Sequence, residues 1–490
     1  MSEAHVLSIR KDVALVEGAG GRVSLESPLV KLALHPISPG ILSAVKLLAD
    51  GGARERELGD VVLEHDGPSA LPHLYLYLHQ FHAHKIICRT VTLGGEPLAT
   101  LVPTSFYYNY EAIHPDPQKK HALSRFACLR NDGGCLVAES PLGHARVVVH
   151  SQRAGSLLAH LVAPHSAAGL AELVPGVDAE TAASFVDLLA SAGVLAEDGA
   201  RGASGKRRGK NRDGRGKDSD ALRQWDFHDL LFHARSRVGR HANPYGGTYR
   251  FVGEIDPLPA VKPPMSEETI DLFKPNLDRL KKTDRPFTSV LEERKSKRAH
   301  SERPISARQL GEFLYRAARS RHVYKSERGE LGSRPYPGGG AIYELEIYAV
   351  VNSCRGVAAG LYHYRPDAHQ LSRLSGQTPQ VERLLEYARH TSQQPRRPQV
   401  LFVVTARFGR VMWKYQSMAY ALVLKDVGAL YQTMYLVGEA MGLAACALGG
   451  GDSDLFAQAA GLDYYAESSV GEFILGSPQD SEARRARVGR

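Results

Sequence analysis

The chain has 490 residues, a length that suggests three domains at roughly 150 residues each. It is 43% hydrophobic and 23% charged, a composition that excludes wholesale disorder and small disulfide scaffolds. No apolar run reaches the length of about 18 residues that a membrane helix needs, and the N-terminus lacks a signal-peptide pattern. We therefore predict a cytoplasmic protein without a membrane partner. The five cysteines form no Cys-x-x-Cys pair, which disfavours a zinc tetrathiolate and suits a reducing compartment.

The net charge of +8 is concentrated in two segments. Residues 199–220 carry a net +5 and the tail from Asp480 to Arg490 carries +2, which leaves +1 for the rest of the chain. The remaining chain has no broad basic face of the kind that nucleic-acid phosphates require, so we predict no nucleic-acid partner. Gly, Ser, Lys and Arg dominate residues 199–220, and this composition predicts a flexible basic linker.

Upstream of that linker the sequence Glu-Ser-Pro-Leu occurs twice, at Glu26–Leu29 and Glu139–Leu142. In each copy one strand-like run precedes the proline, another follows it, and a helical stretch comes next. This order is typical of winged-helix modules, so we predict one such module over residues 1–110 and a second over 111–198. Their helices are rich in Ala, Leu and Val, which favours peptide binding at a strand edge or a structural role over DNA binding.

Residues 221–284 form a connector between these modules and the C-terminal region. Its histidines His228, His233 and His241 lack the i, i+4 spacing of a helical metal site, and no acidic ligand stands at a suitable offset. We therefore predict no metal site. The stretch Pro257–Pro264 predicts an extended Pro-rich strap.

The C-terminal region, residues 285–490, alternates helical and strand patterns. Helices are predicted over residues 289–298, 306–320 and 419–443, and strands over 341–352, 399–408 and 472–476, with a hairpin over 360–374. The helix over 419–443 is apolar on nearly every side, which indicates burial in a large core or between subunits. Together these patterns predict an α+β fold in which helices flank a central sheet.

Four segments of this region carry residues suited to chemistry. Arg294-Lys295-Ser296-Lys297-Arg298 places a hydroxyl among cations and could hold a phosphate, although an exposed basic helix end has the same pattern. Pro337-Gly338-Gly339-Gly340 lets backbone N–H groups approach a flat ligand, or is a flexible loop. Leu448-Gly449-Gly450 ends a helix or contacts a planar cofactor. Lys414-Tyr415 supplies a general base if the lysine is desolvated; a surface lysine is the alternative.

In this order the four segments resemble the flavin-dependent nitroreductase superfamily, and more narrowly the SagB-type thiazole/oxazole dehydrogenases, which include the cyanobactin azoline oxidases. The resemblance covers Thr288–Gly476. The segments Phe227–Arg237 and Gly246–Phe251 resemble the long members of this family, which carry two N-terminal winged-helix-like modules. One departure is Gly338, where the family often has serine.

The resemblance implies FMN bound at a homodimer interface. By position, the residues that would hold its phosphate and ribityl chain are Arg294, Lys295, Ser296 and Arg298. Those that would lie along its isoalloxazine are Pro337, Gly338, Gly339 and Gly340, and those offering backbone contacts near the reactive edge are Leu448, Gly449 and Gly450. Lys414 and Tyr415 match the family's catalytic pair, in which we expect Lys414 to be the base and Tyr415 to be a relay or its partner.

The implied activity is oxidation of a peptide thiazoline or oxazoline to a thiazole or oxazole during maturation of a ribosomally made natural product. The azoline-containing precursor peptide would be the substrate, and a cyclodehydratase is a candidate partner. Two alternatives stay open: an NAD(P)H-dependent nitro or quinone reductase, and a non-enzymatic peptide-binding module. The Lys414-Tyr415 pair and the long N-terminal half favour the azoline oxidase.

Overall fold

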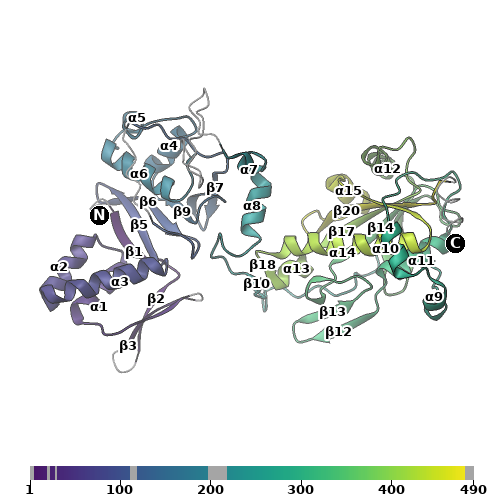
Figure 1. Cartoon of the computed structure of the whole chain (residues 1–490), viewed down its shortest axis with the longest axis horizontal. Helices are drawn as coiled ribbons and strands as arrows, with labels where there is room; N and C mark the ends of the chain where they lie inside the picture. The colour runs from purple at the N-terminus through teal and green to yellow at the C-terminus, as the bar shows by residue number, and fades with distance from the viewer. Residues whose placement is uncertain (1–4, 19–21, 28–29, 111–117, 197–217, 480–490) are drawn as a thin grey trace. The chain divides into compact units, whose positions relative to one another are not determined.

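The computed structural model describes residues 5–18, 22–27, 30–110, 118–196 and 218–479 (Figure 1). The chain forms two compact units, Met1–Asn243 and Pro244–Arg490. Across the described ranges no helix is both long enough and apolar enough to span a membrane. The finer domain boundaries at residues 110, 198, 220 and 284 stay predictions.

An antiparallel six-stranded sheet is the framework of the N-terminal unit, in the order β1-β5-β6-β9-β8-β7. Its strands are β1 (His5–Ile9), β5 (Ile87–Leu93), β6 (Glu96–Pro103), β7 (Cys128–Asp132), β8 (Cys135–Glu139) and β9 (Ala145–Val149). A second sheet consists of β2 (Ala14–Gly18), β3 (Arg22–Glu26) and β4 (Lys31–Leu34). Because β6 pairs with β9, the large sheet joins strands from both predicted winged-helix modules.

Helices cover these strands in two groups, each with its own apolar core. The first group is α1 (Pro39–Asp50), α2 (Glu55–Asp66), η1 (Pro68–Ala70) and α3 (Leu71–Ala83), and the second is α4 (Gln152–His160), α5 (Ala167–Leu173) and α6 (Ala179–Ser191). Each copy of Glu-Ser-Pro-Leu follows the first strand of a hairpin, β3–β4 or β8–β9, although residues 28–29 lie outside the described ranges. Helix α1 or α4 then follows, so both copies have the predicted order of strand, turn, strand and helix.

The predicted basic linker lies mostly outside the described residues, since residues 197–217 are not among them. Its last residues are placed: Asp218 pairs with Arg125 at 2.7 Å, and the Ser219 hydroxyl caps α7 (Asp220–Arg223). Helix α8 (Phe227–Arg235) follows and carries two of the connector histidines. His233 stacks on Trp225 with ring centres 5.5 Å apart.

A seven-stranded antiparallel sheet forms the centre of the C-terminal unit, in the order β11-β16-β15-β14-β17-β20-β19. Its strands are β11 (Thr269–Asp271), β14 (Leu345–Val351), β15 (Gly360–Arg365), β16 (Gln370–Ser375), β17 (Val400–Arg407), β19 (Ala444–Leu448) and β20 (Glu467–Gly476). Every residue of β17 is buried, as its unbroken apolar and β-branched run predicts. Two short pairs stand outside this sheet: β10 (Gly246–Gly247) with β18 (Tyr415–Gln416), and β12 (His322–Ser326) with β13 (Gly329–Ser333).

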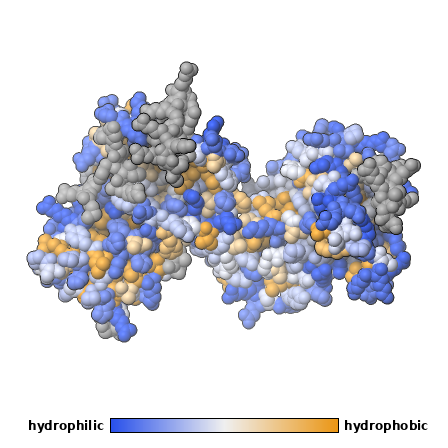
Figure 2. All heavy atoms as spheres, viewed as in Figure 1, coloured by the Kyte–Doolittle hydropathy of each residue, from blue (hydrophilic) through white to orange (hydrophobic). Residues whose placement is uncertain are grey.

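Helices cover both faces of this sheet (Figure 1). One face packs against α11 (Ala307–Ala318) and α14 (Ala419–Ala440), and the other against α12 (Pro379–Ser392) and α15 (Ser453–Ala460). Shorter helices are α9 (Leu277–Thr283), α10 (Phe287–Glu293), η2 (Gly339–Ala341) and α13 (Phe408–Lys414). Within the single chain α14 is not buried on every side, because Tyr420 and Leu424 are 40% and 42% exposed, and its burial between subunits stays a prediction. Hydrophobic residues accordingly reach the surface over this part of the unit in Figure 2.

Two predicted elements have other bounds in the structure. The helix expected over residues 289–298 ends at Glu293, because the chain then runs beside β19 and the Lys297 N–H donates to the Ala445 carbonyl at 3.0 Å. The last strand begins at Glu467, five residues before the predicted start at residue 472. The prediction missed its first half because Ser468 and Ser469 are polar and interrupt the apolar pattern. The first change matters for function, since it places the basic residues on extended chain.

Candidate active site

The glycine loop, Pro337–Gly340, enters β14 through an unusual backbone. Gly340 has a φ of +61°, and the next residue, Ala341, also lies in the left-handed region at +58°. The Gly339 N–H donates a hydrogen bond to Asp426 Oδ2 of α14 at 2.8 Å. A strained loop persists only where its surroundings hold it, and Asp426 supplies one such restraint.

Lys414 and Tyr415 lie against Gly340. The Lys414 Nζ donates to the Gly340 carbonyl oxygen at 3.2 Å and lies 5.2 Å from the centre of the Tyr415 ring. A Cβ added to Gly340 would clash with the Tyr415 hydroxyl and come within 2.8 Å of Lys414 Nζ. Glycine is therefore required here both by the backbone angle and by the close approach of the pair. Both side chains are half-buried, so solvent and ligands still reach the amine.

Asp426 faces a second carboxyl group, that of Glu344, which the sequence analysis did not select. Glu344 is fully buried. Burial, together with the adjacent Asp426, raises the pKa of Glu344 to about 8, and burial also raises the pKa of Asp426. The pair therefore retains a proton near neutral pH, and that proton can bridge the two carboxyl groups behind the glycine loop.

The basic segment, Arg294–Arg298, lies beside β19. The Ser296 hydroxyl forms a hydrogen bond of 2.9 Å with the Tyr435 hydroxyl of α14, which also accepts the Ala447 N–H at 2.8 Å. The Arg294 guanidinium lies 5.2 Å from the centre of the Tyr435 ring. Tyr435 thus connects the basic segment to the end of β19.

Lys297 differs from the other cations of the basic segment. Its Nζ bonds to Glu439 Oε2 at 2.7 Å, and Arg285 bonds to the other oxygen of the same carboxylate at 3.1 Å. Its side chain is only 11% exposed. Lys297 is therefore a structural ion-pair partner, whereas Lys295 and Arg298 are exposed. The residues that the resemblance implies for binding the FMN phosphate and ribityl chain likewise do not include Lys297.

Arg298 lines a hollow of about 900 Å³ at the end of β14 that is remote from the glycine loop. Two further arginines of the loop before β17, Arg396 and Arg397, line the same hollow. Arg396 pairs with Glu302 at 2.8 Å, and Arg397 pairs with Glu386 at 3.3 Å. No sequence pattern singled out these two arginines.

Leu448, Gly449 and Gly450 follow one another at the end of β19. Leu448 is buried, whereas both glycines are exposed, and a Cβ at either would meet no atom within 4 Å. Their backbone groups therefore border open space that a ligand can enter. Unlike Gly340, they are not required by contacts within the chain.

Helix α14 separates the predicted residues into two groups. The glycine-loop flank contains the glycine loop with Lys414 and Tyr415 and contacts α14 at Asp426. The basic flank contains the basic segment with the end of β19 and contacts α14 at Tyr435. At 3.6 residues per turn these two helix positions lie about 180° apart around the axis and roughly 13 Å apart along it. One chain therefore presents two half-sites on opposite flanks of α14.

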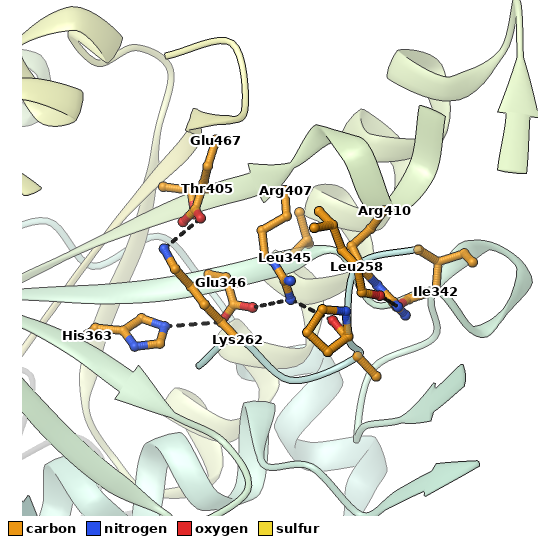
Figure 3. Close-up of polar contacts among 12 residues, drawn as sticks. Leu258, Lys262, Ile342, Leu345, Glu346, His363, Thr405, Arg407, Arg410 and Glu467 are labelled. Atoms are coloured by element: carbon orange, nitrogen blue, oxygen red, sulfur yellow. Dashed lines mark hydrogen bonds and ion pairs between the residues drawn. The ribbon is translucent and has the colours of Figure 1, made fainter. Parts of the chain in front are cut away.

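A buried polar network fixes the Pro-rich strap to the sheet (Figure 3). Lys262 Nζ lies 2.7 Å from both Glu467 Oε2 and the Tyr348 hydroxyl, and the Thr405 hydroxyl donates to Glu467 Oε1 at 2.8 Å. Glu467 is 5% exposed, so its charge is compensated inside the protein.

Two arginines, one at the end of β17 and one in α13, also bond to the same strap. Arg407 donates to the Pro259 carbonyl at 2.9 Å, and Arg410 donates to the Leu258 carbonyl at 2.6 Å. Because α13 ends at Lys414, these contacts fix the helix from which the lysine projects. The sequence predicted the strap but not its partners.

Three family models match the chain. Residues 1–112 match the ThcOx helix-turn-helix domain, residues 121–242 match the cyanobactin oxidase ThcOx, and residues 291–477 match the nitroreductase family. The nitroreductase family is typically flavin-binding. The matches cover the N-terminal unit and the sheet and helices of the C-terminal unit, in agreement with the predicted α+β class.

Curated relatives match parts of the chain. A Methanocaldococcus jannaschii protein named as a nitroreductase is 26% identical over 37% of this chain and 85% of its own length. The trifolitoxin-processing protein TfxB of Rhizobium leguminosarum bv. trifolii is 26% identical over 33% of this chain, and the microcin B17-processing protein McbC of Escherichia coli is 30% identical over 22%. The matches span only 44% and 42% of the lengths of these last two relatives.

Solved structures also align with the chain. A Ralstonia eutropha protein named as a nitroreductase aligns with a TM-score of 0.34 and 22% identity, covering 48% of this chain and 99% of the other. A chain of the Escherichia coli microcin synthetase McbBCD complex, solved with truncated pro-MccB17 bound, aligns with a TM-score of 0.33 and 19% identity over 52% of this chain and 92% of the other.

Proposed function

Because the chain belongs to the cyanobactin oxidase ThcOx family and carries a nitroreductase domain, we propose that it oxidises peptide thiazolines or oxazolines to thiazoles or oxazoles with FMN. Family membership makes it an enzyme of the azoline oxidase type. The observation that carries the mechanism is the contact of Lys414 Nζ with the Gly340 carbonyl, beside Tyr415, on a loop held by α14.

The residues of both half-sites fit FMN. The basic flank offers exposed cations, which suit a phosphate, and backbone groups at Gly449 and Gly450 that border open space. The glycine-loop flank offers a backbone without side chains at Gly338, Gly339 and Gly340, which suits close approach of a flat ring. Arg294, Lys295, Ser296 and Arg298 would hold the phosphate and ribityl chain, and Pro337–Gly340 with Leu448–Gly450 would border the isoalloxazine.

The proposed chemistry uses Lys414 as the base. Oxidation of an azoline to an azole removes a proton from the former Cα and a hydride from the neighbouring ring carbon. When bound, FMN supplies the acceptor for that hydride. Lys414 takes up the Cα proton through Nζ, and the Gly340 carbonyl accepts a hydrogen bond from the ammonium that results. Tyr415 lies beside the amine and serves as its relay to solvent.

The separation of the half-sites supports a homodimer. The two groups contact opposite flanks of α14, and we propose that a second copy brings its own flank to the first so that the groups complete one site. Apolar residues available for such an interface are exposed on α10 and α14: Phe287 is 67% exposed, Leu291 and Leu424 are both 42% exposed. We propose that FMN binds where the two copies meet.

The proposed substrate is an azoline-containing precursor peptide, and a cyclodehydratase is the proposed partner that forms the rings. TfxB and McbC support this proposal because their names describe peptide-toxin processing. The helix-turn-helix domain over residues 1–112 is the proposed place at which such partners are recognised.

The test uses the purified full chain, FMN and a synthetic azoline-containing peptide. We expect a flavin spectrum and a mass loss of about 2 Da per ring, which corresponds to the two hydrogens removed. Lys414→Ala should retain FMN and lose at least about 100-fold in turnover, the usual size of a general-base contribution. Lys425→Ala, which removes an exposed lysine of α14, is the matched control and should oxidise normally.

Three results would contradict the proposal in different ways. Full azole formation by Lys414→Ala would exclude that lysine as the base. Rapid bleaching of the flavin by NADPH without peptide oxidation would indicate a nitro or quinone reductase instead. A protein that binds peptide but no flavin, even with FMN supplied, would indicate a binding module.

A further inference from the structure

The connector residues Gly246–Tyr249 lie against the end of α13, although the two segments are distant in the sequence. Strand β10 pairs with β18, so that Gly247 lies opposite Tyr415, and the Tyr249 N–H donates to the Lys414 carbonyl at 3.2 Å. The Ser417 hydroxyl donates to the Pro244 carbonyl at 2.9 Å. The connector therefore holds the backbone of the proposed catalytic pair over several consecutive residues.

The ring of Tyr249 is held in one place by its neighbours. It packs edge-on against Trp413 with ring centres 5.7 Å apart, and the Arg328 guanidinium lies 4.4 Å from its centre. Its backbone has a φ of +53°, which a residue with a Cβ rarely adopts. Such a conformation persists when the surrounding contacts impose it, and it is frequent at functional sites.

The amine of Lys414 lies between two tyrosine rings and a carbonyl group. Its Nζ is 5.9 Å from the centre of the Tyr249 ring and 5.2 Å from that of Tyr415, both within the range of about 6 Å over which a ring attracts a cation. The Gly340 carbonyl accepts its hydrogen bond at 3.2 Å. Each of these three groups attracts a positive charge.

We propose that Tyr249 is a positioning residue for Lys414, and that its ring stabilises the ammonium formed when Lys414 accepts the substrate proton. The inference rests on the proposed function. A contact that is stronger after proton transfer than before lowers the barrier to that transfer, because it is realised only as the charge develops. The connector thereby contributes a side chain to the chemistry of the C-terminal unit.

The first test compares Tyr249→Leu with Tyr249→Phe, since phenylalanine keeps the ring and leucine does not. We expect Tyr249→Leu to lower kcat about 3- to 30-fold with KM and bound FMN unchanged, and Tyr249→Phe to stay within about twofold of the parent. Val252→Ala, an exposed position of the same connector, is the control. In the Lys414→Ala background the leucine change should have no further effect. Equal losses in both Tyr249 variants, or an effect on KM alone, would overturn the proposal.

The second test needs neither substrate nor turnover. The rate at which an acetylating reagent modifies Lys414 is measured by peptide mass spectrometry and divided by the rate at exposed Lys425. Loss of the ring should raise this ratio several-fold in Tyr249→Leu and leave it unchanged in Tyr249→Phe, because without the ring the amine is no longer restrained. An unchanged ratio in Tyr249→Leu would overturn the inference. The two proposals can fail separately. If the parent oxidises no azoline but the acetylation ratio still rises in Tyr249→Leu, the contact between Tyr249 and Lys414 is supported and the proposed function is wrong.

Discussion

The two flanks of α14 are built in opposite ways. On the glycine-loop flank, Gly340 fits so closely against Lys414 and Tyr415 that no side chain can be added, and Asp426 holds the loop from behind. On the basic flank, Gly449 and Gly450 border open space, and Lys295 and Arg298 are exposed. The difference indicates that the groups proposed to react are held by contacts within the chain, whereas the groups proposed to hold the cofactor are left open to a ligand.

The largest expected effect comes from filling the close contact. Gly340→Ala should lower turnover by about 100-fold, because it displaces Lys414 and Tyr415 by a sizeable fraction of an ångström or more. It should also cost about 1–2 kcal/mol of unfolding free energy, because alanine is strained at a φ of +61°. Steady-state kinetics and urea unfolding measure the two effects.

Gly155→Ala provides the matched control, because a Cβ at that helical position meets no atom within 4 Å. It should leave turnover unchanged. Normal turnover in Gly340→Ala would show that the glycine-loop flank is not organised around the catalytic pair.

A smaller effect is expected on the basic flank, and it should appear in binding rather than in turnover. Arg294→Ala or Arg298→Ala should weaken FMN binding about 10- to 100-fold, the loss expected when one charge-assisted hydrogen bond is removed. Fluorescence titration of the apoprotein with FMN measures the change. The control is Arg279→Ala, which removes an exposed arginine of α9 and should bind FMN like the parent. Parental FMN affinity in both Arg294→Ala and Arg298→Ala would show that the phosphate binds elsewhere.

The last expected effect is on stability rather than on activity, and it concerns the carboxyl pair behind the glycine loop. A carboxyl pKa raised to about 8 on folding means that the folded chain binds more protons than the unfolded chain between the ordinary value of 4.5 and pH 8. The contribution of Glu344 to stability is therefore complete at low pH and declines as pH rises, by at most about 1.4 kcal/mol per pH unit.

Glu344→Gln should remove this decline. Urea midpoints at pH 5 and pH 8 should differ less in the variant than in the parent, whereas Glu267→Gln, at an exposed position, should keep the parental difference. A parental slope that persists in Glu344→Gln would place the titrating group elsewhere.

The sequence correctly predicted the elements that have a regular hydrophobic pattern or a capping residue. The continuous apolar run at residues 399–408 gave a correct central strand, and Ser306 correctly marked the start of α11, where it forms a capping box with Gln309. The structure also brings Gly340, Lys414 and Tyr415 together, a contact that the sequence did not predict. The assignment of their roles stays a prediction.

The sequence did not predict contacts between distant single residues. Asp426 and Glu344 come from a helix and from a loop before a strand, and neither belongs to a motif. Strand β10 has two residues, too few to show any periodicity, so its pairing with β18 and the position of Tyr249 emerge only in the folded chain. The basic segment has the local composition of a helix, but the backbone hydrogen bond from Lys297 to Ala445 favours extended chain instead.

The anchored strap determines where this protein can be cut. A fragment beginning at residue 285 would lack β10, Tyr249 and Lys262, and it would leave the Glu467 carboxylate buried without its cation, at a cost of about 3–5 kcal/mol. A fragment beginning at Pro244 would keep all of these contacts, because they fall within the second compact unit. The junction between Asn243 and Pro244 is therefore the point at which we propose that the N-terminal unit can be exchanged for that of a related protein while these contacts stay intact.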